Sequence, residues 1–541
     1  MTRVAVIGGG IGGLTAAQEL AERNFTVDVY EATGRFGGKA RSYPVGQRGS
    51  LHGEHGFRFF PAFYRHVVET MQRIPTAEGT VADNLVVTEE TLVASTDQPA
   101  QRARTGQPES VREWMQTLRP AFIDDLPPED RAFLLERFLY ILTACDQRRE
   151  HELDNVSWWE FIDADNRSPA LRERLAAATQ ALVALRPRLA SARTMGVIYL
   201  QLLFGQMDPT RPAERILNGP TSEVWIHPWV EYLDSLGVEL HPNTPVERLL
   251  FDGRRITGAE RADGNRIEAD EFVLAVPVHV APDFLTPEIT SAAPELAGIE
   301  RLDTAWMNGI QFYLSTDRPL TRGHQVYTDS PWALTSISQR QFWSGHDFER
   351  ASPDDVEGVL SVIASDWERP GIVYGRPAKA CTRAEIATEV WEQLKAHLNA
   401  TEDVLTDDVL VEWFLDPAIV ETDNGVENRS PLLINTVGSL KHRPPAETNI
   451  ENLGVAGDFV RTNSDLASME SANEAGRRVA NAILRRHRPD TPEATIWTLE
   501  EPAVFEPFRR QDRLQYRLGL PHPAEVTQSA RSFVNRLGVR G

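Results

Sequence analysis

The first forty residues contain glycines and one acid whose spacing could bind a nucleotide. These residues are Gly8, Gly10, Ile11, Gly12, Gly13 and Glu31. Gly8 permits a tight turn, Gly10 lets the backbone approach a pyrophosphate, and Gly13 lets a helix pack closely on a strand. Glu31 can accept hydrogen bonds from the hydroxyls of an adenosine ribose, and its charge would repel a 2′-phosphate. The spacing therefore indicates a dinucleotide site.

The elements around these residues are those that such a site needs. Apolar runs at 4–7 and 26–30 predict two buried parallel strands, and the pattern at 14–23 predicts a helix between them. The N-terminus of that helix offers free N–H groups and a partial positive charge to phosphate oxygens. Because the glycines lie between strand and helix and the acid ends the second strand, the motif is more specific than an isolated glycine turn.

More glycines and three cations follow the acid directly. This stretch includes Ala32, Gly34, Arg35, Gly37, Gly38, Lys39 and Arg41. An NAD site does not need this stretch. In a larger dinucleotide, the second half of the cofactor continues along the protein past the pyrophosphate. The stretch resembles the GRxGGR signature of the FAD-dependent amine oxidase and phytoene desaturase superfamily, with Lys39 where many members have arginine. The resemblance implies FAD and an α/β fold: a Rossmann-like FAD-binding domain of the GR2 type with an interleaved α+β substrate domain.

A second segment near the C-terminus completes the expected flavin site. A strand at 453–459 ends in Gly457 and Asp458, and a helix opens at 469 with Glu470, Ser471 and Ala472. Asp458 can bind ribitol hydroxyls, and the helix N-terminus can face the flavin. No cysteine lies nearby, so we expect the FAD to be non-covalent. The resemblance also implies that Val246 contacts the adenine and that Ala275, at the end of a strand, lies near the flavin.

Polar residues among aromatics at 53–64 suggest a wall of an active site. The segment resembles the GLHxFFxxY segment of carotenoid desaturases and of related squalene-pathway flavoenzymes, with Arg58 in place of their histidine. The resemblance makes Arg58, His55 and Glu54 the catalytic candidates. Gly56, Phe57 and Arg58 are expected to contact the cofactor, where the cation could stabilise a reduced, anionic flavin.

The chain is expected to cross several times between two interleaved domains. The FAD-binding domain comprises 1–75, 219–300 and 449–484, the substrate domain comprises a mainly helical region, 76–218, and a sheet region, 301–448, and a tail follows at 485–541. Apolar helices at 133–144 and 195–207 should be buried or line an apolar cavity. Further helices are expected at 118–123, 158–162 and 171–185. The tail, with an amphipathic helix at 524–537, is expected to pack on the body or to touch a membrane.

Composition limits the remaining classes. The 541 residues carry a net charge of −22, which argues against nucleic acid. The two cysteines, Cys145 and Cys381, lie far apart, so the sequence supports neither a disulfide framework nor a metal site. No run of about 18 apolar residues predicts a membrane span. The first strand begins after three residues, which leaves no room for a signal peptide, and a cytoplasmic location is therefore expected.

Two enzyme classes compete for the function. Amine oxidases of the superfamily hold a water with a lysine on a central strand, and alignment places Asn308 at that position, with none of the four lysines nearby. We therefore expect oxidation of a large apolar substrate, namely desaturation of an isoprenoid or polyene. Because no second GxGxxG is present, the substrate should reduce the flavin, and oxygen or a quinone should reoxidise it. The alternatives are a flavin amine oxidase, a redox-neutral isomerase or dehydroxylase, and a flavin-binding protein without turnover.

Overall fold

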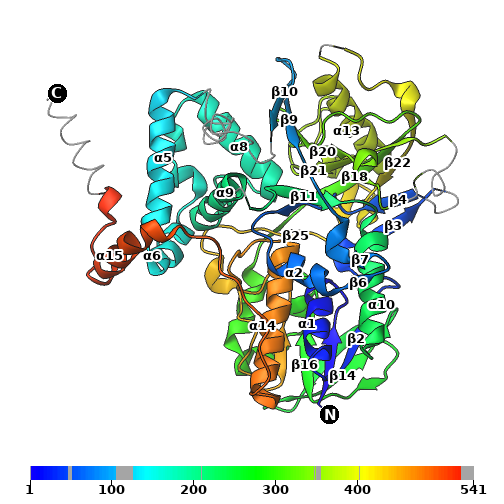
Figure 1. Ribbon diagram of the computed structural model, residues 1–541, viewed down its shortest axis with the longest axis vertical. Coiled ribbons are helices and arrows are strands. Elements are labelled where there is room, and N and C mark those ends of the chain that lie inside the picture. The colour runs from blue at the N-terminus through cyan, green and yellow to red at the C-terminus, as the bar shows by residue number, and fades with distance from the viewer. Residues whose placement is uncertain are drawn as a thin grey trace.

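The computed structural model describes residues 2–46, 51–104, 126–208, 210–346, 348, 355–400 and 402–525. Figure 1 shows a domain containing the N-terminus, a second domain built on a larger sheet, and a group of helices beside them. The chain passes between these parts several times, as the sequence motifs require.

A five-stranded parallel sheet forms the first domain. Its order is β12 (Glu239–His241), β2 (Thr26–Tyr30), β1 (Arg3–Ile7), β16 (Glu271–Leu274) and β26 (Leu453–Val455). The central strands are short apolar runs that are buried on both faces, as parallel strands covered by other elements generally are. The sheet thus places β1 beside β16, about 270 residues later in the chain, and β16 in turn beside β26.

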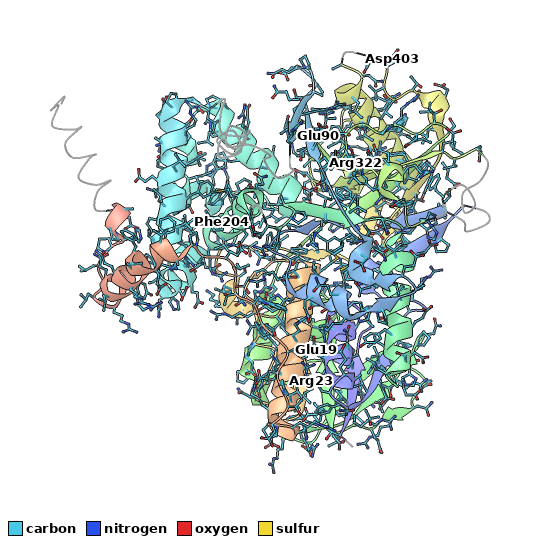
Figure 2. The ribbon with its side chains drawn as sticks, viewed as in Figure 1. Glu19, Arg23, Glu90, Phe204, Arg322 and Asp403 are labelled. Carbon is cyan, nitrogen blue, oxygen red and sulfur yellow. The ribbon has the colours of Figure 1, made fainter. Side chains whose placement is uncertain are left out.

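Helices α1 (Ile11–Ala21) and α14 (Met469–His487) lie against each other in this domain (Figure 1). Small residues allow the contact, because a Cβ at Gly476 would lie 2.5 Å from the carbonyl oxygen of Gly12. Further along α1, Glu19 forms an ion pair at 2.6 Å with Arg23, one helical turn later (Figure 2). Glu19 also lies 3.7 Å from Arg477 of α14. The two halves of the predicted flavin unit therefore form one structural unit.

The remaining elements of this domain follow the glycine-rich segment and the middle of the chain. They are the hairpin β3 (Ser42–Val45) and β4 (Leu51–Glu54), β5 (Phe60–Pro61), α2 (His66–Arg73), the π-turn η5 (Ser222–Ile226) that continues into α10 (His227–Ser235), the three-stranded sheet β13 (Val246–Phe251), β14 (Ile256–Arg261) and β15 (Arg266–Ile267), and α11 (Pro287–Ala292). Helix α10 begins at His227, directly after η5.

A seven-stranded sheet forms the second domain. Its order is β10 (Gln101–Arg104), β9 (Glu90–Ala94), β19 (His324–Tyr327), β20 (Thr335–Ser338), β21 (Gly358–Ala364), β18 (Asn308–Leu314) and β22 (Leu410–Leu415). All pairs are antiparallel except β9 with β19. Helix α13 (Arg383–Leu398), capped by Thr382, packs on this sheet through Trp391, whose ring centroid lies 5.1 Å from that of Phe312. Both central strands, β18 and β21, are buried throughout.

The helical region contains α5 (Pro128–Thr143), α6 (Asp146–His151), α7 (Trp158–Phe161), α8 (Pro169–Val183) and α9 (Ala192–Met207). The helix expected at 118–123 lies outside the described residues. Residues 76–218 also contain β8 (Leu85–Val87), β9, β10 and β11 (Glu214–Leu217), which a mainly helical reading did not include. These strands are short. Strand β10 reads Gln-Arg-Ala-Arg and lies exposed at the edge of the sheet, so its sequence has no apolar pattern that could predict a strand.

The described part of the tail packs on the body. Asp512 of α15 (Glu506–Arg517) is fully buried, and its carboxylate accepts from the backbone N–H of Cys145 at 2.8 Å and from Arg148 Nε at 3.0 Å. Trp497 N–H donates to His66 Nε2 at 2.9 Å. Most of the helix expected at 524–537 lies outside the described residues. Across the described ranges, no helix combines the length and apolarity needed to cross a membrane.

Candidate active site

The glycine turn has the close contacts that its sequence predicts. Gly8 has φ +113°, and a Cβ there would lie 2.4 Å from the carbonyl oxygen of Ala275. A Cβ at Gly13 would lie 2.0 Å from the carbonyl oxygen of Gly8, so strand and helix approach only because neither residue has a side chain. At Gly10 the nearest heavy atom would be the Gly38 Cα at 3.8 Å, which leaves open space at this position.

The N-terminus of α1 presents free donors to this space. Its N-cap is Gly10, which supplies no side-chain acceptor, and no acid lies in its first turn. The amides of Ile11 and Gly12 therefore have no capping side chain, whereas Ser468 caps α14. Unsatisfied amides with the positive end of a helix dipole suit a phosphate group. The space beside Gly10 and this donor set fit the pyrophosphate of a dinucleotide.

Glu31 is buried, and its carboxylate anchors the glycine turn. Its carboxylate accepts from the Gly9 N–H at 3.0 Å and from the Thr33 N–H at 2.9 Å, and Arg41 lies 3.8 Å away. The Thr33 hydroxyl also donates to this carboxylate at 2.7 Å, so about one of its four acceptor positions remains available for a ribose hydroxyl. The Glu31 carbonyl accepts from the Thr244 N–H at 2.8 Å, which brings the segment before Val246 to the same end of the sheet.

The loop after Glu31 returns to the glycine turn. Gly37 N–H donates to the Gly9 carbonyl at 2.8 Å, and a Cβ at Gly38 would lie 3.0 Å from Gly10 Cα. Ala32, Gly34 and Arg35 are exposed at the start of this loop. The segments containing the predicted glycines therefore meet at one point, and Arg35 lies at its solvent-facing edge.

The C-terminal half of the predicted site lies against the same turn. A Cβ at Gly12 would lie 3.2 Å from the Ala472 carbonyl oxygen and 3.3 Å from the Ala456 carbonyl carbon, directly before Gly457 and Asp458. Ser471 is buried, and its hydroxyl bonds to that of Ser464 at 2.6 Å. The structure therefore brings the early glycines and the 456–472 segment together, as the flavin prediction requires.

The side chain of Glu470 has another partner. Its carboxylate accepts from the N–H groups of Arg65, His66 and Val67 at 2.9, 2.9 and 3.0 Å, and from His66 Nδ1 at 2.7 Å. It therefore caps the N-terminus of α2 from another helix. Only the backbone of Glu470, in the first turn of α14, remains for the predicted cofactor contact.

Arg58 and Lys39 lie next to each other, close to the glycine-rich loop that ends in Gly38. Arg58 Nη2 donates to the Lys39 carbonyl at 3.1 Å, and Arg58 Nε is buried with no hydrogen-bond partner among the described residues. Burial lowers the pKa of Arg58, which the charges of Glu54 and Asp416 oppose. Burial also lowers the pKa of Lys39, whose Nζ donates to the Pro431 carbonyl at 2.7 Å. Arg58 Nε therefore has an unused donor position among the described residues.

His55 belongs to a buried polar chain that the sequence did not reveal. Its Nδ1 pairs with Asp416, which is 1% exposed and also accepts from Asn308 Nδ2 at 2.7 Å. Asn308 in turn accepts from Asn428 Nδ2 at 2.8 Å. Burial by itself would raise the pKa of Asp416, but the charge of His55 and hydrogen bonds from His55, the Ala418 N–H and Asn308 lower it to about 2. The carboxylate is therefore ionised and fixes the His55 ring.

The hydrogen bonds of Glu54 hold two segments of the chain together. Its buried carboxylate accepts from Ser42 Oγ at 2.9 Å and from the Thr221 N–H at 2.7 Å. It therefore joins the β3–β4 hairpin to the start of η5. Together with Phe57 and Arg58, Glu54 lines a cavity of about 10 Å³, so the wall around Arg58 is closely packed.

Two further observations lay beyond sequence reasoning. His279, four residues after Ala275, has a buried Nδ1 without a partner among the described residues, and burial together with the charge of Lys39 lowers its pKa to about 4. Lys39 also lies within electrostatic range of Asp416, whose carboxylate accepts a hydrogen bond from Asn308. Both observations depend on residues that are far apart in the chain, and no local sequence pattern could have indicated them.

A larger cavity of about 1320 Å³ lies between the helical region and α14. Ile141 of α5 and Val197, Leu200 and Phe204 of α9 form its apolar wall, and Phe204 is labelled in Figure 2. The two helices predicted to be buried or to line an apolar cavity do contribute that wall. Charged residues also line the cavity, among them Arg149, Arg193 and Arg461, whereas Glu54, His55 and Arg58 do not line it.

Comparison with known proteins decides the family. The model of the flavin containing amine oxidoreductase family matches residues 11–484. The chain belongs to this family. The 15-cis-phytoene desaturase of Synechococcus elongatus is 23% identical over 493 residues, covering 90% of this chain and 96% of the relative. The zeta-carotene desaturase of Synechocystis sp. is 24% identical over 501 residues, covering 89% and 97%.

Solved structures share the fold. The cyclohexylamine oxidase of Brevibacterium oxydans superposes with a TM-score of 0.60 at 15% identity, covering 90% of this chain and 99% of that one. Family membership and the fit of the glycine turn to a dinucleotide make this chain a flavin-dependent oxidoreductase. The α/β fold with a mixed second sheet agrees with the sequence-based prediction.

Proposed function

We propose that the flavin is FAD, bound without a covalent link. The space beside Gly10, the uncapped N-terminus of α1 and the buried carboxylate of Glu31 support a dinucleotide form. Both cysteines are buried outside the glycine turn and its partner segment, and Cys145 bonds through its backbone to the tail. When bound, FAD supplies the capacity to accept a hydride. Heating the purified protein should release free FAD into the supernatant, and yellow colour remaining on the denatured chain would contradict this.

The Glu31→Ala variant should bind FAD more weakly by about 1–3 kcal/mol, the usual range for hydrogen bonds to a charged group. This corresponds to roughly 5- to 150-fold in dissociation constant. The change removes acceptors for the ribose and also loosens the Gly9 and Thr33 amides that Glu31 holds. Glu31→Gln, which keeps an oxygen for one of these amides, should lie between. A fluorescence titration with FAD measures the effect, and equal affinity in all three proteins would exclude the ribose role.

We propose that the substrate is an extended apolar molecule of the isoprenoid or polyene class and that the reaction is a desaturation. The observation that carries this is the match, across about nine-tenths of the chain, to two carotenoid desaturases. The apolar wall of α5 and α9 supports it, because a long hydrocarbon needs such a surface. Anaerobic mixing with polyenes and amines, described at the end of the Discussion, tests the proposal.

Amine oxidation is the alternative that the solved neighbours keep open. Asn308 stands where the sequence alignment places the amine oxidase lysine, and both ends of its amide are engaged, by Asp416 and by Asn428. Lys39 approaches this group but bonds to the Pro431 carbonyl. The arrangement offers a fixed carboxylate–imidazole pair in place of a free ammonium group, which favours the apolar substrate.

We assign separate tasks to the residues of this wall. Asp416 fixes the ring of His55, whose other nitrogen can hold or pass a proton. Arg58 supplies a fixed positive charge and an unpartnered donor. Glu54, committed to Ser42 and Thr221, positions the segment that contains both. Oxygen or a quinone remains the proposed electron acceptor.

We further propose that the tail contacts a membrane, where an apolar substrate would dissolve. Leu514 on α15 and Leu518 at its C-cap expose 62% and 73% of their surface, near the exposed Arg517. Apolar side chains with neighbouring cations suit an anionic lipid surface. Wild type should float with phosphatidylglycerol vesicles, and the variant with Leu514→Asp and Leu518→Asp should not. Equal flotation of both proteins, or none of either, would contradict the contact.

A further inference from the structure

Two histidines and one glutamate meet at the outer end of the β3–β4 hairpin. His52 Nε2 lies 2.8 Å from one carboxylate oxygen of Glu223, and His346 Nδ1 lies 2.6 Å from the other. The three potential ligand atoms lie within 4.8 Å of one another. His52 comes from β4, Glu223 from the π-turn η5, and His346 from the loop after Phe342. The sequence indicated no metal site, because these residues are far apart in the chain.

The ligand set of the cluster suits a cation. His52 and His346 each offer an imidazole nitrogen, and Glu223 offers a carboxylate oxygen. No other acid joins this cluster among the described residues. The cluster therefore provides one oxygen and two nitrogen ligands. Zinc and similar divalent ions prefer such borderline ligands, whereas Mg²⁺ and Ca²⁺ prefer oxygen.

The geometry is close to that of a bound site. Ligands at about 2.0–2.1 Å from a tetrahedral ion lie roughly 3.3 Å apart. The present His–Glu separations of 2.8 and 2.6 Å would therefore have to open by about 0.5 and 0.7 Å, and the two imidazole nitrogens already lie within 4.8 Å of each other. The imidazoles are largely buried, with 18% and 6% side-chain exposure, while Glu223 is 37% exposed. Solvent therefore reaches the cluster from the Glu223 side, where an ion could enter and a water could complete its coordination.

The surroundings fix the two rings in place. Tyr313 donates its hydroxyl proton to the His52 carbonyl at 3.0 Å, which anchors β4 at this residue. The His346 ring packs edge-on against Trp343, with centroids 5.6 Å apart, and against the His52 ring at 5.4 Å. Trp343 is buried, so the loop that supplies His346 is held by the core. Ligands that are already positioned lose little conformational freedom when an ion binds.

We propose that His52, Glu223 and His346 bind one zinc-class divalent ion, with water in the remaining position. The site lies beside the proposed active-site wall, because Glu54 follows His52 by two residues and accepts from Thr221, two residues before Glu223. The ion joins the β3–β4 hairpin, the start of η5 and the loop containing His346. Its role is structural: it stabilises the wall that contains Glu54, and the redox reaction does not require it.

Equilibrium dialysis of the flavin-loaded full chain against micromolar Zn²⁺, followed by metal analysis, tests the proposal. Wild type should retain about one ion more than Glu223→Gln. The glutamine keeps hydrogen-bonding atoms for both histidines but is a poor ligand, so it separates a metal site from a hydrogen-bonded clasp. His346→Ala should lose the ion as well, and His151→Ala, which removes an exposed histidine of α6, should retain it.

The thermal midpoint provides a second readout. Zn²⁺ should raise the unfolding temperature of wild type and of His151→Ala, and should leave that of Glu223→Gln unchanged, because an ion that binds only the folded state stabilises it. Excess Mg²⁺ should not compete. If Glu223→Gln fails to fold, X-ray absorption of zinc-loaded wild type should show two imidazole ligands. Equal zinc retention in wild type and Glu223→Gln, or a zinc spectrum without imidazole, would overturn the site.

Discussion

Arg58→Ala is expected to slow substrate turnover by on the order of 10²-fold, the usual cost of removing one pre-positioned donor from a catalytic site. The Arg58 guanidinium is already in place without a substrate, since Nη2 bonds to the Lys39 carbonyl and Nε is buried without a partner among the described residues. A fixed donor in a water-poor site stabilises negative charge that develops during the reaction, and it needs no reorganisation to do so. Burial lowers the pKa of Arg58, but an arginine remains protonated at any ordinary pH.

Two variants make this result interpretable. Arg58→Lys keeps a charge but not the planar donor set, so it should recover part of the rate. Arg167→Ala is the matched control, because Arg167 also has a buried, unpartnered Nε but lies in the helical region, paired with Asp163 at 2.9 Å. It should leave turnover unchanged. Stopped-flow measurement of flavin bleaching by substrate gives the rates, and a wild-type rate in Arg58→Ala would remove Arg58 from the active site.

Asp416→Ala is expected to lower the free energy of unfolding by about 3–5 kcal/mol, the range for removing one partner of a buried ion pair. The carboxylate is 1% exposed and serves His55, Asn308 and the Ala418 N–H together. Its loss leaves buried donors without an acceptor, which adds a desolvation penalty. Asp416→Asn keeps an acceptor and should be less destabilising. Urea unfolding monitored by circular dichroism gives the free energies.

The same carboxylate predicts an acid-dependent loss of stability. The pKa of Asp416 is about 2 in the folded protein and 3.8 as the reference value, so the folded state favours the ionised form. This contribution is fully present above pH 3.8 and is lost as the pH falls through 2, and it amounts to about 2 kcal/mol at 1.36 kcal/mol per pKa unit. The stability difference between wild type and Asp416→Asn should shrink across this window. A difference that stays constant down to pH 2 would contradict the ion pair.

Local sequence predicted the parts of the fold that depend on local chemistry. Gly8 and Gly13 are required by contacts within one strand–turn–helix unit, so their spacing alone indicated the dinucleotide site. The helices at 133–144 and 195–207 were likewise predicted, because the apolar pattern of each lies within one short segment. In such segments the pattern and the structure have the same physical cause.

The rest of the site depends on contacts between distant segments. Asp416 and His279 join it only through the sheet order and the folding of loops, and neither lies in a recognisable motif. Glu470 was expected at the cofactor by its place in a motif, but its carboxylate caps α2, about 400 residues earlier in the chain. The His52, Glu223 and His346 cluster escaped notice for the same reason. Such tertiary partners become visible only when the fold is known.

We propose that this flavin-dependent oxidoreductase acts on an extended apolar substrate and not on simple amines. Anaerobic mixing of the purified holoprotein with two panels, one of phytoene-like polyenes and one of primary and secondary amines, tests it most directly. Loss of the oxidised-flavin absorbance reports reduction by the substrate. We predict rapid bleaching by at least one polyene, slowed in Arg58→Ala, and no bleaching by any amine. Rapid bleaching by an amine, with none by any apolar compound, would contradict the proposed function.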